Sequence, residues 1–219
     1  MRLFIALEIP EPVRREVRRR VAGLRDRLPR ARWVDLEVLH LTLLFLDEVA
    51  PERAATLAAA LGPVFASFPA LLLRLAGGGT FPPGRPARVA WIGVTAPPEL
   101  MSLQAAVARA AAVDLPPEDG RAYRPHVTLA RCPSPWPREA AQKFAAAFPA
   151  EIGPPFLASR GVLIDSKLSP RGPRYRDLAE LPLAARAAET PDAAATAAAI
   201  GAGGDDDAAG ARGDAGAAR

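Results

Sequence analysis

The chain has 219 residues, of which 50% are apolar and 24% charged, and its formal net charge is +4. This length suits one large globular domain or two small ones, and no apolar run approaches the roughly 20 residues that span a bilayer. A single cysteine excludes an internal disulfide and a thiolate metal cluster. The ordered regions of a signal peptide are also missing, so we expect a cytoplasmic protein.

The first half of the chain alternates predicted strands and helices. Segments dense in leucine, β-branched and aromatic residues predict strands at 2–9, 38–46 and 71–76. Apolar residues at helical spacing predict a helix after Pro10, through Val13, Val17, Val21, Leu24 and Leu28. A second helix is predicted at 52–61, interrupted near Gly62 and Pro63, and a loop rich in glycine and proline at 77–86.

The second half repeats this order. Strands are predicted at 87–94, 125–131, 156–164 and 175–178, helices at 98–112 and 137–148, and a turn at 169–174. The repeat indicates an internal duplication. We therefore expect a bilobal α+β fold with pseudo-two-fold symmetry, in which antiparallel sheets line a central cleft and helices lie outside. The lobes would cover about 1–76 and 87–183, and strand exchange between them is left open.

The composition changes after Leu183. Residues 184–219 contain 17 alanines in 36 positions and no leucine, valine or aromatic residue. Such a segment buries too little apolar surface to offset its ordering entropy, so a disordered tail is predicted. The tail carries a net charge of −3, which leaves +7 on residues 1–183. A basic domain favours an anionic partner such as nucleic acid, although arginines on solvated helix faces explain the charge equally well.

The chain has only two histidines, and both open the pattern His-x-Thr-Leu, at 40–43 and 126–129. Threonine fills 7 of 219 positions, so this coincidence would arise by chance about once in a thousand such chains. Residues i and i+2 of a strand share a face, so each strand should present its His and Thr together and bury its apolar residues. Two-fold symmetry would bring the two pairs together across the cleft: His40 with Thr42, and His126 with Thr128.

Two facing imidazoles can perform acid–base chemistry without a metal, because histidine titrates near pH 6.5. One ring can take a proton from water while the other donates a proton to a leaving oxygen, which suits displacement at phosphorus. The hydroxyls of Thr42 and Thr128 can bind the non-bridging phosphate oxygens. Arg131 can add a charge-assisted contact, but strict alternation places it on the Val127 face unless the strand ends or bulges near Ala130.

Other side chains near the motifs are candidates for binding the rest of an RNA substrate. Tyr123 and Phe81 can stack on a base, whereas Trp91, inside a predicted strand, is better explained by core packing. Four arginines could line a phosphate path, and solvated surface positions explain them equally well: Arg85, Arg88, Arg121 and Arg124.

The paired motifs resemble those of the two-histidine phosphoesterase superfamily, and within it the bacterial and archaeal RNA 2′,3′-cyclic phosphodiesterases, formerly called 2′-5′ RNA ligases. The similarity covers nearly all of 1–183 and includes RLFIALEIP (2–10), LHLTLLFLDEV (39–49), FPPGRPARVAWIGV (81–94), YRPHVTLAR (123–131) and LIDSKLSPRGPRY (163–175). Asp47 stands where the family usually has glycine, in a turn after the strand. The acidic tail has no counterpart in the family.

The resemblance implies a bilobal fold with an active site between the lobes. It implies a hydrolase, needing no metal or other cofactor, that opens RNA 2′,3′-cyclic phosphate ends to 2′-phosphomonoesters. In that scheme His40 protonates the departing O3′, His126 accepts the proton of the attacking water, and Thr42 and Thr128 hold the phosphate. Joining RNA ends through a 2′-5′ bond is implied as a side activity. The expected partners are RNA ends or nucleotides with a 2′,3′-cyclic phosphate, with no membrane, and the expected state is a monomer.

Three alternative roles for the histidines are weaker. A half-buried structural role would suit one histidine, but two histidines in matched motifs argue against it. A zinc site needs three or four ligands, and only Asp47 and Cys132 lie close to the histidines in the sequence. An inactive module of the same fold could capture RNA ends or nucleotides on its basic surface, but both histidines and both threonines are intact.

Overall fold

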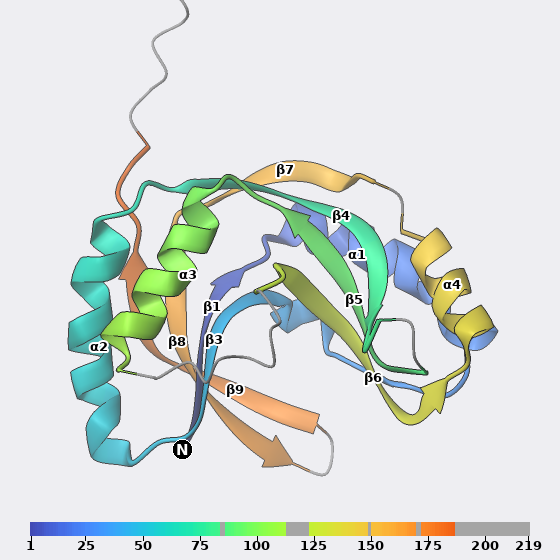
Figure 1. The fold of residues 1–219 in the computed structure, drawn as a ribbon, viewed down its shortest axis with the longest axis horizontal. Helices are drawn as coiled ribbons and strands as arrows, with labels where there is room; N and C mark the ends of the chain where they lie inside the picture. Colours follow the sequence, from blue (N-terminus) through green and yellow to red (C-terminus); the bar gives the residue numbers. More distant parts are fainter. Residues whose placement is uncertain (84–85, 113–122, 149, 170–171, 187–219) are drawn as a thin grey trace, which may run out of the picture. The chain divides into compact units, whose positions relative to one another are not determined.

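Nine strands of the described chain gather into two antiparallel sheets in the computed structural model (Figure 1). The structure describes residues 1–83, 86–112, 123–148, 150–169 and 172–186. The first sheet has the order β3-β1-β8-β9 and the second the order β2-β6-β5-β4-β7. The strands are β1 Arg2–Glu8, β2 Arg32–Trp33, β3 His40–Glu48, β4 Leu71–Phe81, β5 Ala87–Thr95, β6 His126–Trp136, β7 Ile152–Ala158, β8 Arg160–Ser169 and β9 Gly172–Pro182.

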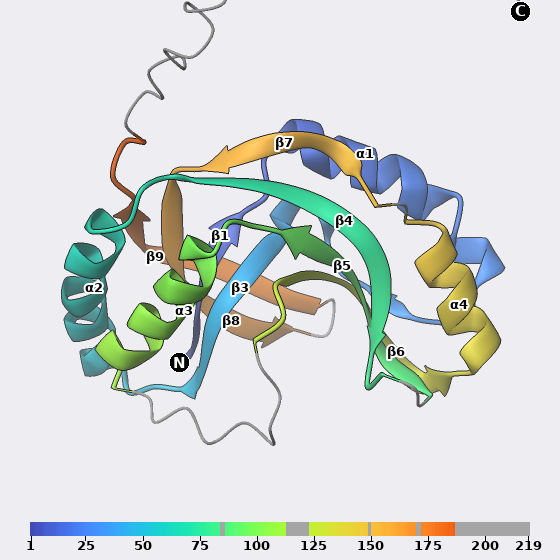
Figure 2. The same cartoon turned by 45° about the horizontal axis from the view of Figure 1, so that its top comes forward.

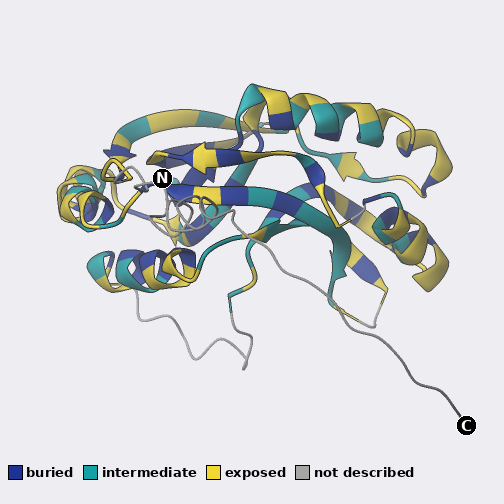
Figure 3. Cartoon of the chain, turned by 90° about the horizontal axis from the view of Figure 1, so that it is seen from above, coloured by how far each residue is buried: buried dark blue, intermediate teal, exposed yellow. Residues whose placement is uncertain are grey.

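Helices cover one face of each sheet. The helices are α1 Glu11–Ala22, α2 Pro51–Ala66, α3 Glu99–Ala110 and α4 Arg138–Ala146, and two short 3-10 turns lie at Arg25–Arg27 and Leu36–Val38. Helices α2 and α3 pack on the first sheet, and α1 and α4 on the second. The helices turn buried stripes towards the sheets and exposed stripes outward (Figure 3). The expected α+β architecture with antiparallel sheets and outer helices is confirmed.

The opposite face of each sheet, called its inner face below, carries the histidine motifs. On the first sheet it includes a small apolar cluster apart from the main core, formed by Phe4, Ala6, Val162 and Ile164 with Tyr175 packed against it. On the second sheet it includes Phe81 and Trp91 beside His126. The indole of Trp91 lies so close over Gly79 that a Cβ at that glycine would sit 2.2 Å from the ring. A side chain at Gly79 would therefore displace Trp91 from this face.

Both sheets contain strands from both halves of the chain. In the first sheet, β1 and β3 from the first half pair with β8 and β9 from the second, and in the second sheet β4 lies between β5 and β7. Figure 2 shows β4 curving across the second sheet beside β7. The predicted lobes, 1–76 and 87–183, therefore follow the repeat in the sequence. The two sheets do not coincide with these lobes, because each sheet takes strands from both halves of the chain.

Two element boundaries in the first half differ from prediction. Helix α2 continues through Gly62 and Pro63 to Ala66, because Leu57, Leu61 and Phe65 extend its buried stripe at intervals of four. Pro63 has no backbone N–H, so the helix loses one hydrogen bond close to its C-terminal end. Strand β4 runs to Phe81, so the predicted loop at 77–86 is partly strand, and a bulge after Ala76 places Gly77 at a φ of 67°.

The predicted strand at 156–164 is two strands that belong to different sheets. Strand β7 pairs with β4 and strand β8 pairs with β1, and the chain changes sheets at Ser159. A run of extended, apolar residues looks the same on both sides of such a crossing, so periodicity cannot locate it. Strands β6 and β9 are also longer than predicted, and the two-residue β2 was missed.

The described chain ends three residues beyond the predicted domain boundary. The N–H of Ala184 donates to the carbonyl of Phe68, and the carbonyl of Ala184 accepts from Ala70. These bonds tie the start of the predicted tail to the segment before β4, and the rest of the tail, 187–219, lies outside the described residues. None of the helices in the described part is both long and apolar enough to cross a bilayer.

Candidate active site

Each of the two histidine motifs begins a strand, one in each sheet. His40 is the first residue of β3, at the edge of the first sheet, and His126 is the first residue of β6. The short strand β2 pairs with β6 only at Ala130 and Arg131, so the second motif extends beyond that pairing. Strands β3 and β6 contact each other. The fold therefore brings together two motifs that lie 86 positions apart in the sequence.

Burial alternates along both motifs as their sequence predicts. The histidines and threonines of both motifs are half-buried on the inner faces, whereas the apolar residues between and after them are buried: Leu41, Leu43, Val127 and Leu129. Each motif strand thus anchors itself in the core through one face and presents an imidazole and a hydroxyl on the other.

The last residue of each motif forms a bulge, and the bulge in β6 decides the position of Arg131. In β6, Thr128 pairs with Trp91 and Ala130 with Ala90, so Leu129 is the extra residue. Leu129 and Ala130 are therefore both buried, and Arg131 returns to the face of Thr128. Strict alternation would have placed Arg131 on the face of Val127. The extra residue Leu129, one position before Ala130, breaks this alternation.

The bulge in β3 gives Phe45 the same place on the first sheet. Leu43 is the extra residue there, because Thr42 pairs with Ala6 and Leu44 with Ile5. Phe45 stands five residues after His40, as Arg131 stands five residues after His126. Its ring is 48% exposed and stacks on Phe4, with centroids 5.4 Å apart.

Both imidazoles are held in the same way. The Nδ1 of His40 lies 2.9 Å from the carbonyl oxygen of Val38, and the Nδ1 of His126 lies 2.7 Å from that of Arg124. A carbonyl can only accept a hydrogen bond, so Nδ1 carries the proton in both rings. In a neutral ring, Nε2 is then left as the proton acceptor for substrate chemistry.

Aromatic rings surround each histidine. His40 lies 4.8 Å from Phe4 and 5.5 Å from Tyr175, and His126 lies 5.1 Å from Phe81, between ring centroids. Burial lowers the pKa of both histidines, and the bond to a backbone carbonyl opposes the shift.

Arg131 acts electrostatically on both sheets. Its positive charge further lowers the pKa of His126, on the same strand. It also counteracts the rise that burial causes in the pKa of Tyr175, which belongs to the first sheet. Arg131 therefore lies within electrostatic range of a side chain on each inner face.

The other predicted binding residues have mixed outcomes. Phe81 lies edge-on against His126, while the Tyr123 hydroxyl donates to the carbonyl of Thr42 at 2.8 Å. Trp91 is half-buried on the inner face rather than in the core, and its indole nitrogen has no hydrogen-bond partner in the described structure. Arg88 and Arg124 are exposed, and Arg85 and Arg121 lie outside the described residues.

Three site residues were missed in the sequence: Phe4, Phe45 and Tyr175. Phe45 and Arg131 each stand five positions after a motif histidine, and this equal spacing could have identified Phe45. No local pattern marks Phe4 or Tyr175, which reach His40 only because β1 and β9 belong to the same sheet as β3.

Within the described ranges, no group of three or more His, Cys, Asp or Glu side chains could hold a metal ion. Cys132 is buried, and burial raises the pKa of its thiol to about 11. Asp47 lies 3.4 Å from Arg2 at the far end of β3. These two candidate zinc ligands therefore do not join the histidines.

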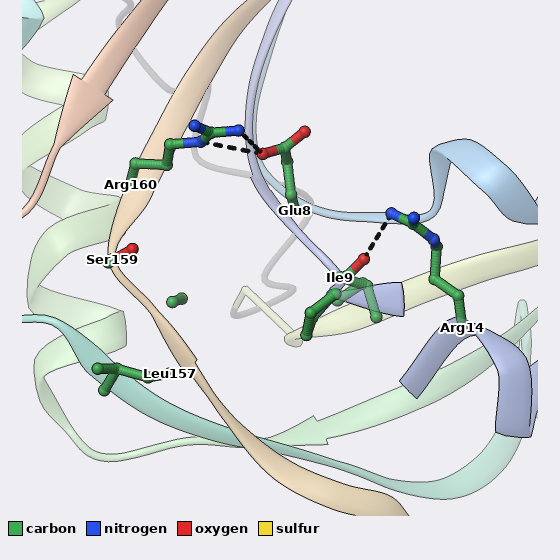
Figure 4. A pocket seen from close by; sticks show the side chains of 8 residues that line it. Glu8, Ile9, Arg14, Leu157, Ser159 and Arg160 are labelled. Carbon is green, nitrogen blue, oxygen red and sulfur yellow. Dashed lines mark hydrogen bonds and ion pairs between the residues drawn. The ribbon is translucent and has the colours of Figure 1, made fainter. Parts of the chain in front are cut away.

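A hollow of about 330 Å³ lies where β7 passes into β8 (Figure 4), and it is lined in part by Glu8, the register partner of His40 on β1. Glu8 accepts hydrogen bonds from Arg160 there, the shorter at 2.8 Å, and Arg14 donates to the carbonyl of Ile9 at 3.0 Å. Arg14 and Arg160 at this hollow are thus already bonded to groups of the protein itself. The inner faces around the histidines are the better candidate for anion binding.

The family model of the 2′-5′ RNA ligase superfamily matches residues 10–164. The RNA 2′,3′-cyclic phosphodiesterase of Thermus thermophilus is 35% identical over 194 residues, covering 84% of this chain and 90% of that protein. The enzyme of the same name from Archaeoglobus fulgidus is 32% identical, covering 81% and 98%. That from Geobacillus stearothermophilus is 31% identical over 82% of this chain, which spans only 56% of its length.

Solved structures agree with the sequence relatives. TT0787 of Thermus thermophilus matches with a TM-score of 0.69 and 28% identity, covering 85% of this chain and 100% of that one. Escherichia coli LigT complexed with 3′-AMP matches with a TM-score of 0.60 and 25% identity, covering 83% and 96%. The family model spans most of the chain and includes both histidine motifs, so the chain belongs to the 2′-5′ RNA ligase superfamily.

Proposed function

We propose that this protein hydrolyses 2′,3′-cyclic phosphate ends of RNA to 2′-phosphomonoesters, with His40 and His126 as the acid–base pair and no metal. One observation carries the proposal: two His-x-Thr motifs begin contacting strands, and each histidine donates its Nδ1 proton to the backbone. Both rings then offer Nε2 to a substrate. Relatives named RNA 2′,3′-cyclic phosphodiesterase support the substrate class.

The hydrolysis step needs one base and one acid. Neutral His126 takes a proton from water as the water oxygen forms a bond to phosphorus. The bond from phosphorus to O3′ breaks, and protonated His40 gives its proton to O3′, which leaves the phosphate on O2′. The hydroxyls of Thr42 and Thr128 donate to the non-bridging oxygens, and the Arg131 guanidinium balances their charge.

The surroundings of the two histidines favour this assignment of roles. Burial lowers the pKa of His126, and the Arg131 charge lowers it further, which favours the neutral ring that a base requires. Burial lowers the pKa of His40 without a contribution from a cation, and a bound phosphate anion would raise this pKa. The phosphate would raise the pKa of both rings, but the Arg131 charge opposes this rise at His126, so His40 is the proposed acid.

The same arrangement accounts for a ligase side activity. A 5′-hydroxyl of a second RNA end in place of the water would attack the cyclic phosphate with the same acid and base, and the product would be a 2′-5′ bond. Water outcompetes this nucleophile unless the second end is bound close by. We expect the protein to act as a cytoplasmic monomer.

The decisive test is incubation with an oligonucleotide that ends in a 2′,3′-cyclic phosphate, with and without EDTA. We expect a 2′-phosphate product and an unchanged rate in EDTA. A 3′-phosphate product would overturn the assignment of the leaving oxygen. Loss of activity in EDTA with rescue by Zn²⁺ would favour a metal site. Tight binding of the oligonucleotide without turnover would show an RNA-end binding module instead.

A further inference from the structure

A hydrogen bond joins the approach to the second motif with the first motif. The hydroxyl of Tyr123 donates to the backbone carbonyl of Thr42 at 2.8 Å, between residues 81 positions apart. Tyr123 stands three residues before His126, and Thr42 is the threonine of the first motif. Among the described residues, the two motif segments are linked by no other side-chain hydrogen bond.

The receiving strand has an open edge. Strand β3 has only β1 as a neighbour in its sheet, and an edge strand leaves some backbone groups without a sheet partner. The Tyr123 hydroxyl supplies a donor to one carbonyl of this strand at the motif itself. The bond thus holds the Thr42 peptide from outside the first sheet.

The donating segment is fixed to the second sheet and to the His126 ring. The carbonyl of Pro125 accepts from the N–H of Val94 in β5 at 3.1 Å. The carbonyl of Arg124 accepts from Nδ1 of His126 at 2.7 Å. A displacement of Tyr123 along this short segment would therefore be transmitted to the second imidazole.

Burial keeps the Tyr123 hydroxyl available as a donor. Tyr123 is half-buried, and burial raises the pKa of its phenol well above the usual range. The hydroxyl stays protonated at any pH at which the histidines titrate. Its interaction with Thr42 is therefore constant through the working range of the proposed acid and base.

We propose that Tyr123 is a positioning residue whose hydroxyl bond to Thr42 sets the separation of the two motif strands, so that both imidazoles reach one phosphate. This rests on the proposed function. It differs from a role in stacking on a base, because stacking would use the ring and leave the hydroxyl dispensable. The two roles therefore make opposite predictions for a phenylalanine at this position.

The test is Tyr123→Phe, which keeps the ring and removes only the donor. We expect kcat on a cyclic-phosphate oligonucleotide to fall about tenfold with KM within about twofold, because small misplacements of catalytic groups slow the chemical step. Ser67→Ala is the matched control: it removes a 2.7 Å side-chain bond to the Val64 carbonyl at the end of α2. Unchanged kcat in Tyr123→Phe, or a change in KM alone, would overturn the proposal.

A second readout does not depend on activity. The chain has only two histidines, so their ring Cε1–H signals in an NMR spectrum are resolved without interference from other imidazoles. We expect Tyr123→Phe to shift or broaden at least one of these signals, and Ser67→Ala to leave both unchanged. If the wild type shows no turnover, the proposed function fails and these signals alone decide the positioning role. Spectra identical to wild type in Tyr123→Phe would then overturn it.

Discussion

The two histidines stand in the same motif, on the same kind of strand and before the same bulge, yet their surroundings differ. His40 faces Phe4 and Tyr175, and the residue five positions on is the exposed Phe45. His126 faces Phe81 and Trp91, and the corresponding residue is Arg131. The motif is repeated, whereas the residue beyond the bulge is an aromatic ring on one side and a cation on the other.

This difference shows how a symmetric motif can support an asymmetric reaction. Hydrolysis needs one imidazole that arrives neutral and one that arrives protonated, and identical environments would not distinguish them. In the proposed mechanism the Arg131 charge, which lowers the pKa of His126, distinguishes this ring from His40. Substitutions at the two histidines and at the residues around them test this difference.

The largest expected effect is loss of either imidazole. His40→Ala and His126→Ala should each lower kcat by about 10²–10⁴-fold, because each removes a proton-transfer group. Both rings are only half-buried, so the melting temperature should stay close to that of the wild type. A substrate with sulfur in place of O3′ separates the two roles, because a thiolate leaves without a proton. It should restore activity to His40→Ala and not to His126→Ala, and the reverse result would exchange the acid and the base.

Arg131→Gln should have the next largest effect. Loss of the cation removes a contact to the phosphate, and we expect kcat/KM to fall about 10²-fold. The pKa of His126 should rise, because the Arg131 charge lowers it in the wild type. An NMR titration of the two histidines checks this, with Phe45→Ala as the control on the other sheet. A shift of the His40 titration alone would contradict the pairing of Arg131 with His126.

The pH dependence should reflect both rings. The base must be neutral and the acid protonated, so kcat/KM should follow a bell-shaped curve. Burial lowers the pKa of both histidines in the free protein, which places the optimum below about pH 6.5. The optimum of kcat should lie higher, because a bound phosphate favours the protonated ring. A single limb, or a kcat/KM optimum well above pH 7, would contradict this account.

The smallest expected effect concerns a feature of β3 that β6 lacks. Asp47 lies near the end of β3, not in the turn expected after this strand, and has a φ of 52°, in the left-handed region where glycine is favoured. The glycine that the resembling family usually has at this position would suit this backbone. Asp47→Gly and Asp47→Ala both lose the ion pair with Arg2. The glycine variant should nevertheless unfold with a free energy about 1 kcal/mol higher than the alanine variant. Equal stability of the two variants in urea denaturation would show that the backbone at residue 47 relaxes.

Local sequence patterns were sufficient for most elements and for the faces on which the motif residues lie. Repeated apolar spacing predicted α1, and period-two alternation placed His40 with Thr42 and His126 with Thr128. The errors occurred where another segment decides the outcome. Strand β4 extends through its glycines because β5 pairs with them. The chain passes from one sheet to the other at Ser159 because β7 pairs with β4 and β8 pairs with β1.

The sequence by itself determined which side chains the two motifs offer, two imidazoles and two hydroxyls, and the faces on which they lie, because strand periodicity is a local property. Only the tertiary structure decided what surrounds them. A bulge one residue long brings Arg131 to the face of His126, and sheet pairing brings Phe4 and Tyr175 to His40. The Tyr123 bond to Thr42 joins segments 81 residues apart. Such contacts depend on backbone register and on long-range packing, which no window of the sequence contains.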